Sequence, residues 1–149
     1  MKARFVGPIV FYVRNLEWSL MFYRDLLGFK EISRIFDGKA VALTSGHTHQ
    51  ELLLIDVGAA PSAPSGWRAG LYHIRIKIGD SLDEFRAAKK ELEETRLSII
   101  GMSDHTKIQS LYLDDPDGNE VELYVDVDPT IRKNDPAAVL APIKPLLHR

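Results

Sequence analysis

The chain of 149 residues has no cysteine, no excess of charge of either sign and no long apolar run. Without cysteine it can form no disulfide, and it has neither a thiolate metal ligand nor a cysteine nucleophile, so any metal must be held by imidazole and carboxylate groups. A formal net charge of −2 gives no electrostatic reason to expect nucleic acid or an anionic membrane as partner. The expected partner is a small molecule.

Targeting and membrane segments are also missing from the sequence. No stretch approaches the ~20 apolar residues that a membrane-spanning helix needs. The amino-terminal segment alternates and is interrupted by Arg14 and Asn15, so it lacks the continuous apolar region of a signal peptide. We therefore expect a cytoplasmic protein. Its hydrophobic content of 45% is enough to form a buried core.

The chain contains the same order of predicted elements twice, namely one strand, one helix and three strands. The first copy spans residues 5–58 and the second spans residues 70–126. Residues 59–69 between them are rich in Pro, Gly, Ser and Ala and keep no period, as in a linker. Residues 127–149 hold several prolines and are predicted to form an extended tail that packs over the domain or a partner. We predict a single domain over residues 1–149.

Aligning the two copies makes Pro8 the counterpart of His73 and Leu53 the counterpart of Glu122. Strand side chains alternate between faces, so each strand of the second copy has one polar face, whereas the corresponding face of the first copy is apolar. The polar faces point either to water or into a cleft. Two copies that curve together would enclose a pocket that is half apolar and half polar, the usual form of a small-molecule site.

Two segments, "FYRDLLGF" at residues 22–29 and "DPDGNEVEL" at residues 115–123, lie within these paired units. Together they resemble the vicinal oxygen chelate superfamily of glyoxalases, fosfomycin- and bleomycin-resistance proteins and extradiol ring-cleaving dioxygenases. The resemblance covers roughly residues 5–126. It implies an α+β fold in which two βαβββ modules form a curved mixed sheet around a cleft, with helices on the outer face. Relatives commonly pair, so the resemblance also allows a homodimer.

The extradiol dioxygenase branch carries a longer signature that this chain resembles closely. In it, a His is followed by an aliphatic residue and Tyr, then by an acidic residue, Pro and Gly, and finally by Glu. Here the pattern runs from His105 through Tyr112 and residues 115–118 to Glu122, and the one departure is Ser103, two residues before the His.

This resemblance implies a set of functional residues. His73 and Glu122 would be ligands of Fe(II) or Mn(II), and Tyr112 and His105 would assist near substrate and dioxygen. His49 resembles in placement the acid–base histidine of this branch. A neutral imidazole and a carboxylate suit such an ion, and a histidine can move the proton of a catechol at neutral pH. The implied substrate is a small aromatic, catecholic or otherwise chelating compound.

Pro8 departs from the family pattern, because the other histidine ligand begins the first strand of the first unit. Proline cannot coordinate a metal through its side chain, so His47 or His49, a partner chain or water would have to complete the ligand set. Alternatively, the chain has no cofactor and is a metal-free binding or resistance protein, which binds an apolar or aromatic compound. A third choice, a glyoxalase-type isomerase or lyase, wants a carboxylate where this chain has Leu53.

Ordinary structural roles also fit these residues. His73 and Glu122 are then polar side chains on a strand face, and Tyr112 packs in the wall of a cleft. His49 and His105 are then plain polar loop residues.

Overall fold

The computed structural model describes residues 1–104 and 108–128. The described chain forms two compact units by its backbone contacts. The first holds residues 1–65 and 115–118, and the second holds residues 66–104, 108–114 and 119–128 of the described chain. His105 and the tail from residue 129 lie outside the described residues, so the predictions made for them stay predictions.

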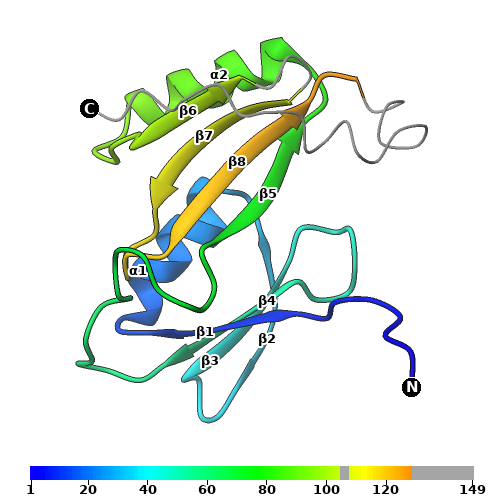
Figure 1. Cartoon of the computed structure of the whole chain (residues 1–149). Helices are drawn as coiled ribbons and strands as arrows, with labels where there is room; N and C mark the ends of the chain where they lie inside the picture. Colours follow the sequence, from blue (N-terminus) through cyan, green and yellow to red (C-terminus); the bar gives the residue numbers. More distant parts are fainter. Residues whose placement is uncertain (105–107, 129–149) are drawn as a thin grey trace. The chain divides into compact units, whose positions relative to one another are not determined.

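The first unit is a four-stranded sheet with a helical segment on it. Its strand order is β1-β4-β3-β2, with β1 parallel to β4 and the other neighbours antiparallel (Figure 1). Its elements are β1 (Ile9–Val13), α1 (Leu16–Leu20), the π-helical η1 (Met21–Leu26), β2 (Lys30–Ile35), β3 (Ala40–Thr44) and β4 (Leu52–Asp56).

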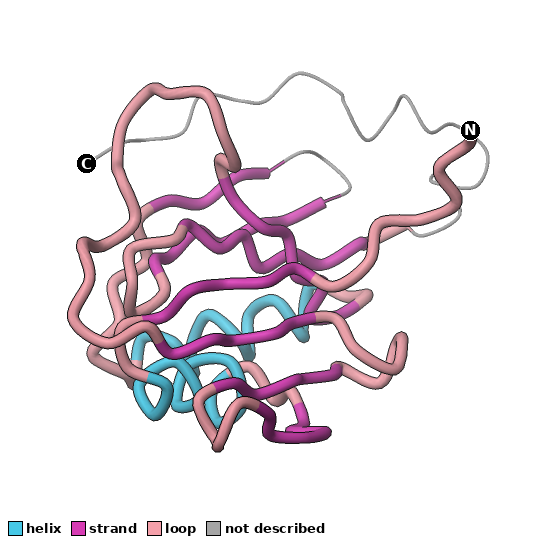
Figure 2. The backbone as a smooth tube through the Cα atoms, turned by 90° about the horizontal axis from the view of Figure 1, so that it is seen from below, coloured by secondary structure: helices cyan, strands magenta, loops and turns pink. Residues whose placement is uncertain are grey.

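The second unit repeats this topology with the strand order β5-β8-β7-β6, again with only its first pair parallel (Figure 1). Its elements are β5 (His73–Gly79), α2 (Leu82–Glu93), β6 (Gly101–Asp104), β7 (Ile108–Asp114) and β8 (Glu120–Asp126). The predicted class, α+β with two βαβββ modules, is confirmed, and both sheets are open. The connection between β4 and β5 contains neither helix nor strand (Figure 2).

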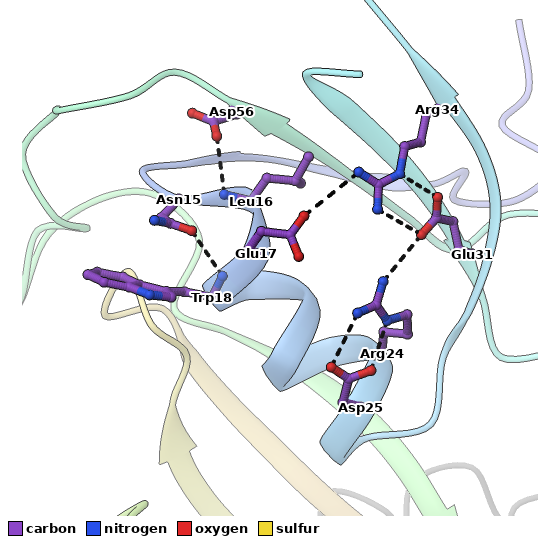
Figure 3. A network of polar contacts seen from close by, with 9 residues as sticks. All are labelled: Asn15, Leu16, Glu17, Trp18, Arg24, Asp25, Glu31, Arg34 and Asp56. Carbon is purple, nitrogen blue, oxygen red and sulfur yellow. Dashed lines mark hydrogen bonds and ion pairs between the residues drawn. The ribbon is translucent and has the colours of Figure 1, made fainter. Parts of the chain in front are cut away.

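The first helical segment begins and ends on side chains and a glycine that the sequence supplies. Asn15 Oδ1 accepts a hydrogen bond from the Trp18 N–H at 3.1 Å, and an Asp56 carboxylate oxygen accepts from the Leu16 N–H at 3.2 Å (Figure 3). At the other end, Gly28 has a φ of +80°, and its N–H bonds to the Arg24 carbonyl at 3.1 Å.

Ion pairs join this helical segment to β2 on the exposed surface. Glu31 lies between Arg24 and Arg34, at 3.4 Å and 2.6 Å respectively, and Arg34 also faces Glu17 at 3.8 Å (Figure 3). Arg24 pairs with Asp25 at 2.8 Å as well. Since water screens such exposed pairs, they contribute little to the stability of the fold.

The helix α2 starts with a reciprocal cap. The Ser81 hydroxyl accepts from the Glu84 N–H at 3.2 Å, while the Glu84 carboxylate accepts from the Ser81 hydroxyl and the Asp80 N–H, both at 2.8 Å. The helix then buries Phe85 and Leu92 and contacts β5, β7 and β8. No helix in the described residues is long and apolar enough to cross a membrane.

Alternate strand residues form the core of each unit. In the first unit the buried set is Phe11, Val13, Val41, Leu43, Leu52 and Leu54. In the second unit it is Ile74, Leu111, Leu113, Val121, Leu123 and Val125. Because side chains alternate along a strand, the residues between these sets share the opposite face of each sheet, and there the two units differ.

Candidate functional site

Polar side chains from three strands meet on one face of the second unit's sheet. The parallel pairing of β5 with β8 places Arg75 beside Glu122, and the antiparallel pairing of β7 with β8 places Tyr112 on its other side. His73 lies two residues before Arg75 and therefore shares its face. Glu122 is the centre of this polar face.

The carboxylate of Glu122 is buried and has three close neighbours. His73 Nε2 and Arg75 Nε lie 3.1 Å and 2.8 Å from Oε2, and the Ser110 hydroxyl donates to Oε1 at 2.6 Å. Only 4% of Glu122 is exposed, so these neighbours compensate a charge that would otherwise be costly to bury. Neither Arg75 nor Ser110 is among the predicted site residues, although strand alternation puts Arg75 on the face of His73 and Ser110 on the face of Tyr112.

His73 is held between two acidic side chains and two aromatic rings. Its Nδ1 lies 3.6 Å from Glu120 Oε2, and these two atoms are buried without a hydrogen-bond partner among the described residues. The imidazole centroid is 4.4 Å from the Tyr72 ring and 6.0 Å from the Tyr112 ring. Both ring nitrogens of His73 therefore face carboxylate oxygens.

Two tyrosines of this face keep their hydroxyl protons at neutral pH. Burial raises the pKa of Tyr112, its hydrogen bond with Ser103 lowers the pKa by less, and the charge of Glu122 raises it further. Burial and the neighbouring Glu120 raise the pKa of Tyr72. The Tyr112 hydroxyl lies 3.3 Å from the Ser103 hydroxyl, and either can be the donor. Tyr112 can therefore offer a proton to a hydrogen bond next to His73.

His47 and His49 belong to the first unit, in the loop before β4. Glu51 holds that loop through hydrogen bonds from the Ser45 N–H, the Ser45 hydroxyl and the Thr48 N–H at 2.9, 3.0 and 2.7 Å. Both histidines are exposed. Their positions are those of solvated loop residues, and the acid–base role of His49 stays a prediction.

The Asp-Pro-Asp-Gly turn at residues 115–118 is bound into the first unit. Asp115 accepts from the Tyr23 hydroxyl at 2.8 Å, and burial together with the charge of Asp115 raises the pKa of Tyr23. Asp117 accepts from the N–H and the Nε of Arg14 at 3.1 and 2.8 Å, and from the Ser19 hydroxyl at 3.5 Å. Both aspartates are buried, so the turn has a structural role that its sequence alone did not reveal.

A metal ion would find two donors on the polar face. His73 Nε2 and Glu122 Oε2 are 3.1 Å apart, close to the roughly 3 Å between two adjacent ligands that each lie about 2.1 Å from one ion. The described part of the chain holds no group of three or more His, Cys, Asp or Glu that could hold a metal. The two residues thus fit part of a ligand set, and Arg75 approaches the same oxygen.

Comparison with known proteins places this geometry in a family. A model described as Glyoxalase/Bleomycin resistance protein/Dioxygenase superfamily matches residues 6–123. The chain belongs to this superfamily. The predicted resemblance is thereby confirmed at the level of the superfamily.

Individual relatives of this superfamily member differ in activity. It is 34% identical over 121 residues to the catechol-2,3-dioxygenase of Bacillus subtilis (strain 168). The matched residues cover 81% of this chain and 41% of that protein. It is 30% identical over 129 residues to the metallothiol transferase FosB of Staphylococcus epidermidis, 83% of each chain. The chain therefore spans less than half the length of that dioxygenase.

A solved structure of a glyoxalase/dioxygenase from Nostoc punctiforme has a TM-score of 0.73 and covers 84% of this chain and 92% of its own. At 20% identity this likeness concerns the fold. The relatives support enzymatic activity in general. Because they catalyse different reactions by their names, they do not single out one reaction for this chain.

Proposed function

We propose that this superfamily member is a metal-dependent enzyme of the extradiol dioxygenase type, which acts on a small aromatic compound with two adjacent hydroxyls. The observation that carries the proposal is the convergence of a partly buried imidazole and a buried carboxylate, His73 Nε2 and Glu122 Oε2, at 3.1 Å. The identity of 34% to a catechol dioxygenase supports the same reaction class.

The residues present suit Fe(II) or Mn(II), which accept imidazole and carboxylate ligands together. An ion bound by His73 and Glu122 would supply the Lewis acidity and the dioxygen chemistry of ring cleavage. To coordinate through Nε2, the imidazole must carry its proton on Nδ1. Glu120 Oε2, which has no hydrogen-bond partner among the described residues and lies 3.6 Å away, is the group that can accept that proton and so fix the tautomer.

Tyr112 would donate a hydrogen bond to an oxygen of the substrate, because a tyrosine hydroxyl is protonated at neutral pH and burial raises the pKa of Tyr112 further. His49 and His105 keep their predicted roles, as acid–base and as an assisting residue. The proposed ligand is a small aromatic substrate. We further propose that the chain is cytoplasmic and that it forms a homodimer. Light scattering can test the homodimer.

Metal analysis of protein purified without chelators tests the proposal. We expect near-stoichiometric iron or manganese in the unaltered chain and a loss of most of it in His73→Ala and Glu122→Gln. Lys77→Met is the matched control, because Lys77 lies on the same strand face but pairs with Asp80. Oxygen uptake with a panel of catechols after anaerobic Fe(II) loading should follow the metal content. Absence of both metal and oxygen uptake would remove the dioxygenase proposal.

A second function is favoured by one specific contact. Arg75 Nε lies 2.8 Å from Glu122 Oε2 and can neutralise that carboxylate in place of a metal, while Pro8 stands where the family has a histidine. The chain would then be a metal-free protein that binds an aromatic compound on the same face. This alternative gains if an aromatic ligand binds chelator-treated protein as tightly as untreated protein.

A further inference from the structure

Arg75 is the cation of the polar face whose hydrogen-bonding capacity is least used. Among the described residues it makes two contacts, the ion pair from Nε to Glu122 Oε2 at 2.8 Å and the stacking of its guanidinium carbon over the Tyr124 ring at 4.4 Å from the centroid. Its side chain is 37% exposed. The terminal nitrogens therefore keep their donors for another partner.

The two contacts also fix the direction of the guanidinium. The ion pair holds one end of the group, and the aromatic ring holds its plane. A guanidinium already held in place loses little further freedom when it binds, which is the usual source of affinity in a preorganised site. Its planar terminal nitrogens match the two oxygens of a carboxylate.

The neighbouring cations of this face are differently engaged. The ammonium of Lys77, two residues further on the same strand face, is paired with Asp80. His73 has both ring nitrogens beside carboxylate oxygens of Glu120 and Glu122. Among the cations that the structure describes on this face, Arg75 is thus the one that is equipped to receive an anion from outside.

We propose that Arg75 is a specificity-determining residue that binds a carboxylate group of the ligand, so that the preferred ligand is an aromatic acid. The inference rests on the proposed function, because it takes the face of His73 and Glu122 as the ligand-binding face. The hydroxyls of the ligand would lie toward His73 and Glu122, and its carboxylate toward Arg75.

Three probes separate the carboxylate from the hydroxyls: protocatechuate, a catechol with a carboxylate; catechol, its neutral parent; and benzoate, which has no hydroxyl. Calorimetric titration of the metal-loaded protein should show protocatechuate binding at least about tenfold more tightly than catechol, as expected for a charge-assisted bidentate contact. Arg75→Met should abolish that preference by weakening protocatechuate binding while catechol binding stays within about twofold.

If Arg75→Met does not fold, Arg75→Lys is the second variant, because it keeps the positive charge beside Glu122. Arg75→Lys should retain only part of the preference for protocatechuate, because an ammonium is a point charge without the planar fork of a guanidinium. Lys77→Met should leave the preference unchanged. Equal binding of protocatechuate and catechol by the unaltered chain would overturn the inference. Equal weakening of both by Arg75→Met would also overturn it, since that pattern marks a structural role.

Failure of the proposed function would look different from failure of the inference. If the protein takes up no metal but binds benzoate, and Arg75→Met loses this binding, the carboxylate inference stands and the dioxygenase proposal fails. If metal and catechol bind normally, but the affinities for benzoate and protocatechuate are the same in the unaltered chain and in Arg75→Met, the dioxygenase proposal stands and the inference fails.

Discussion

Glu51 in the first unit and Glu120 in the second occupy the same position in their sheets. Ile9 pairs with Leu52 in one sheet as Ile74 pairs with Val121 in the other, so each glutamate stands immediately before the corresponding paired residue. The carboxylate of Glu51 accepts hydrogen bonds from its own loop. In Glu120, by contrast, the buried oxygen that faces His73 has no hydrogen-bond partner in the described chain. One glutamate stabilises a loop, and the other is available to a site.

The rest of the two faces differs in the same way. By the strand registers, Leu53 corresponds to Glu122 and Ala42 to Tyr112. The other face of each sheet carries buried apolar core residues in both units. Since both units keep apolar core residues on one face, the opposite face is free to carry chemistry in one unit and not in the other.

The Asp-Pro-Asp-Gly turn before β8, which is bound into the first unit, gives the largest expected effect. Asp117→Ala should lower the free energy of unfolding by about 2–3 kcal/mol, because it leaves the donors of Arg14 and Ser19 without their acceptor in a mostly buried place. Urea denaturation measures the change. The control is Asp25→Ala, which removes an exposed ion pair of the first unit and should cost far less stability. Similar losses in both variants would contradict the structural importance of the turn.

The two equivalent glutamates predict the next effect. Glu120→Gln should weaken Mn(II) binding by at least about tenfold, or roughly 1.4 kcal/mol, because His73 loses the carboxylate that favours a proton on Nδ1. Glu51→Gln should leave Mn(II) binding unchanged. Calorimetric titration gives both affinities, and nitrogen NMR of the His73 ring should show a shift of tautomer in Glu120→Gln only. An unchanged tautomer would show that Glu120 does not position the ring.

Tyr112, whose counterpart is Ala42, predicts a smaller effect that separates chemistry from stability. Tyr112→Phe and Ser103→Ala each remove the same hydrogen bond, of 3.3 Å, and each should cost about 1 kcal/mol of folding free energy. Only Tyr112→Phe should also lower kcat with a catechol, by about tenfold, if its hydroxyl donates to the substrate. Equal kcat in the two variants would assign Tyr112 a packing role.

Local sequence patterns could predict much of this organisation. Strand alternation and the internal repeat were enough to align Pro8 with His73 and Leu53 with Glu122, and the observed registers agree with that alignment. The ion pair of Arg75 with Glu122 could not be predicted, because it requires the register of two strands that are far apart in the sequence. The binding of Asp117 to Arg14, 103 positions away, is a tertiary contact with no local signal.

The smallest effect concerns the loop that Glu51 holds. Burial alone would raise the pKa of the Glu51 carboxyl, but hydrogen bonds from the Thr48 and Ser45 N–H groups outweigh it and lower the pKa to about 2. Because the folded pKa lies below the unfolded one, this stabilisation is complete above about pH 4.5 and is lost as the pH falls toward about 2. It should amount to less than about 1 kcal/mol, since the loop is exposed. The difference in unfolding free energy between the unaltered chain and Glu51→Gln, measured from pH 6 to pH 2 (roughly the range that spans both pKa values), should therefore shrink on acidification. A difference that stays constant over that range would mean that the Glu51 carboxylate does not stabilise the loop, and the contrast with Glu120 would then rest on the buried oxygen of Glu120 alone.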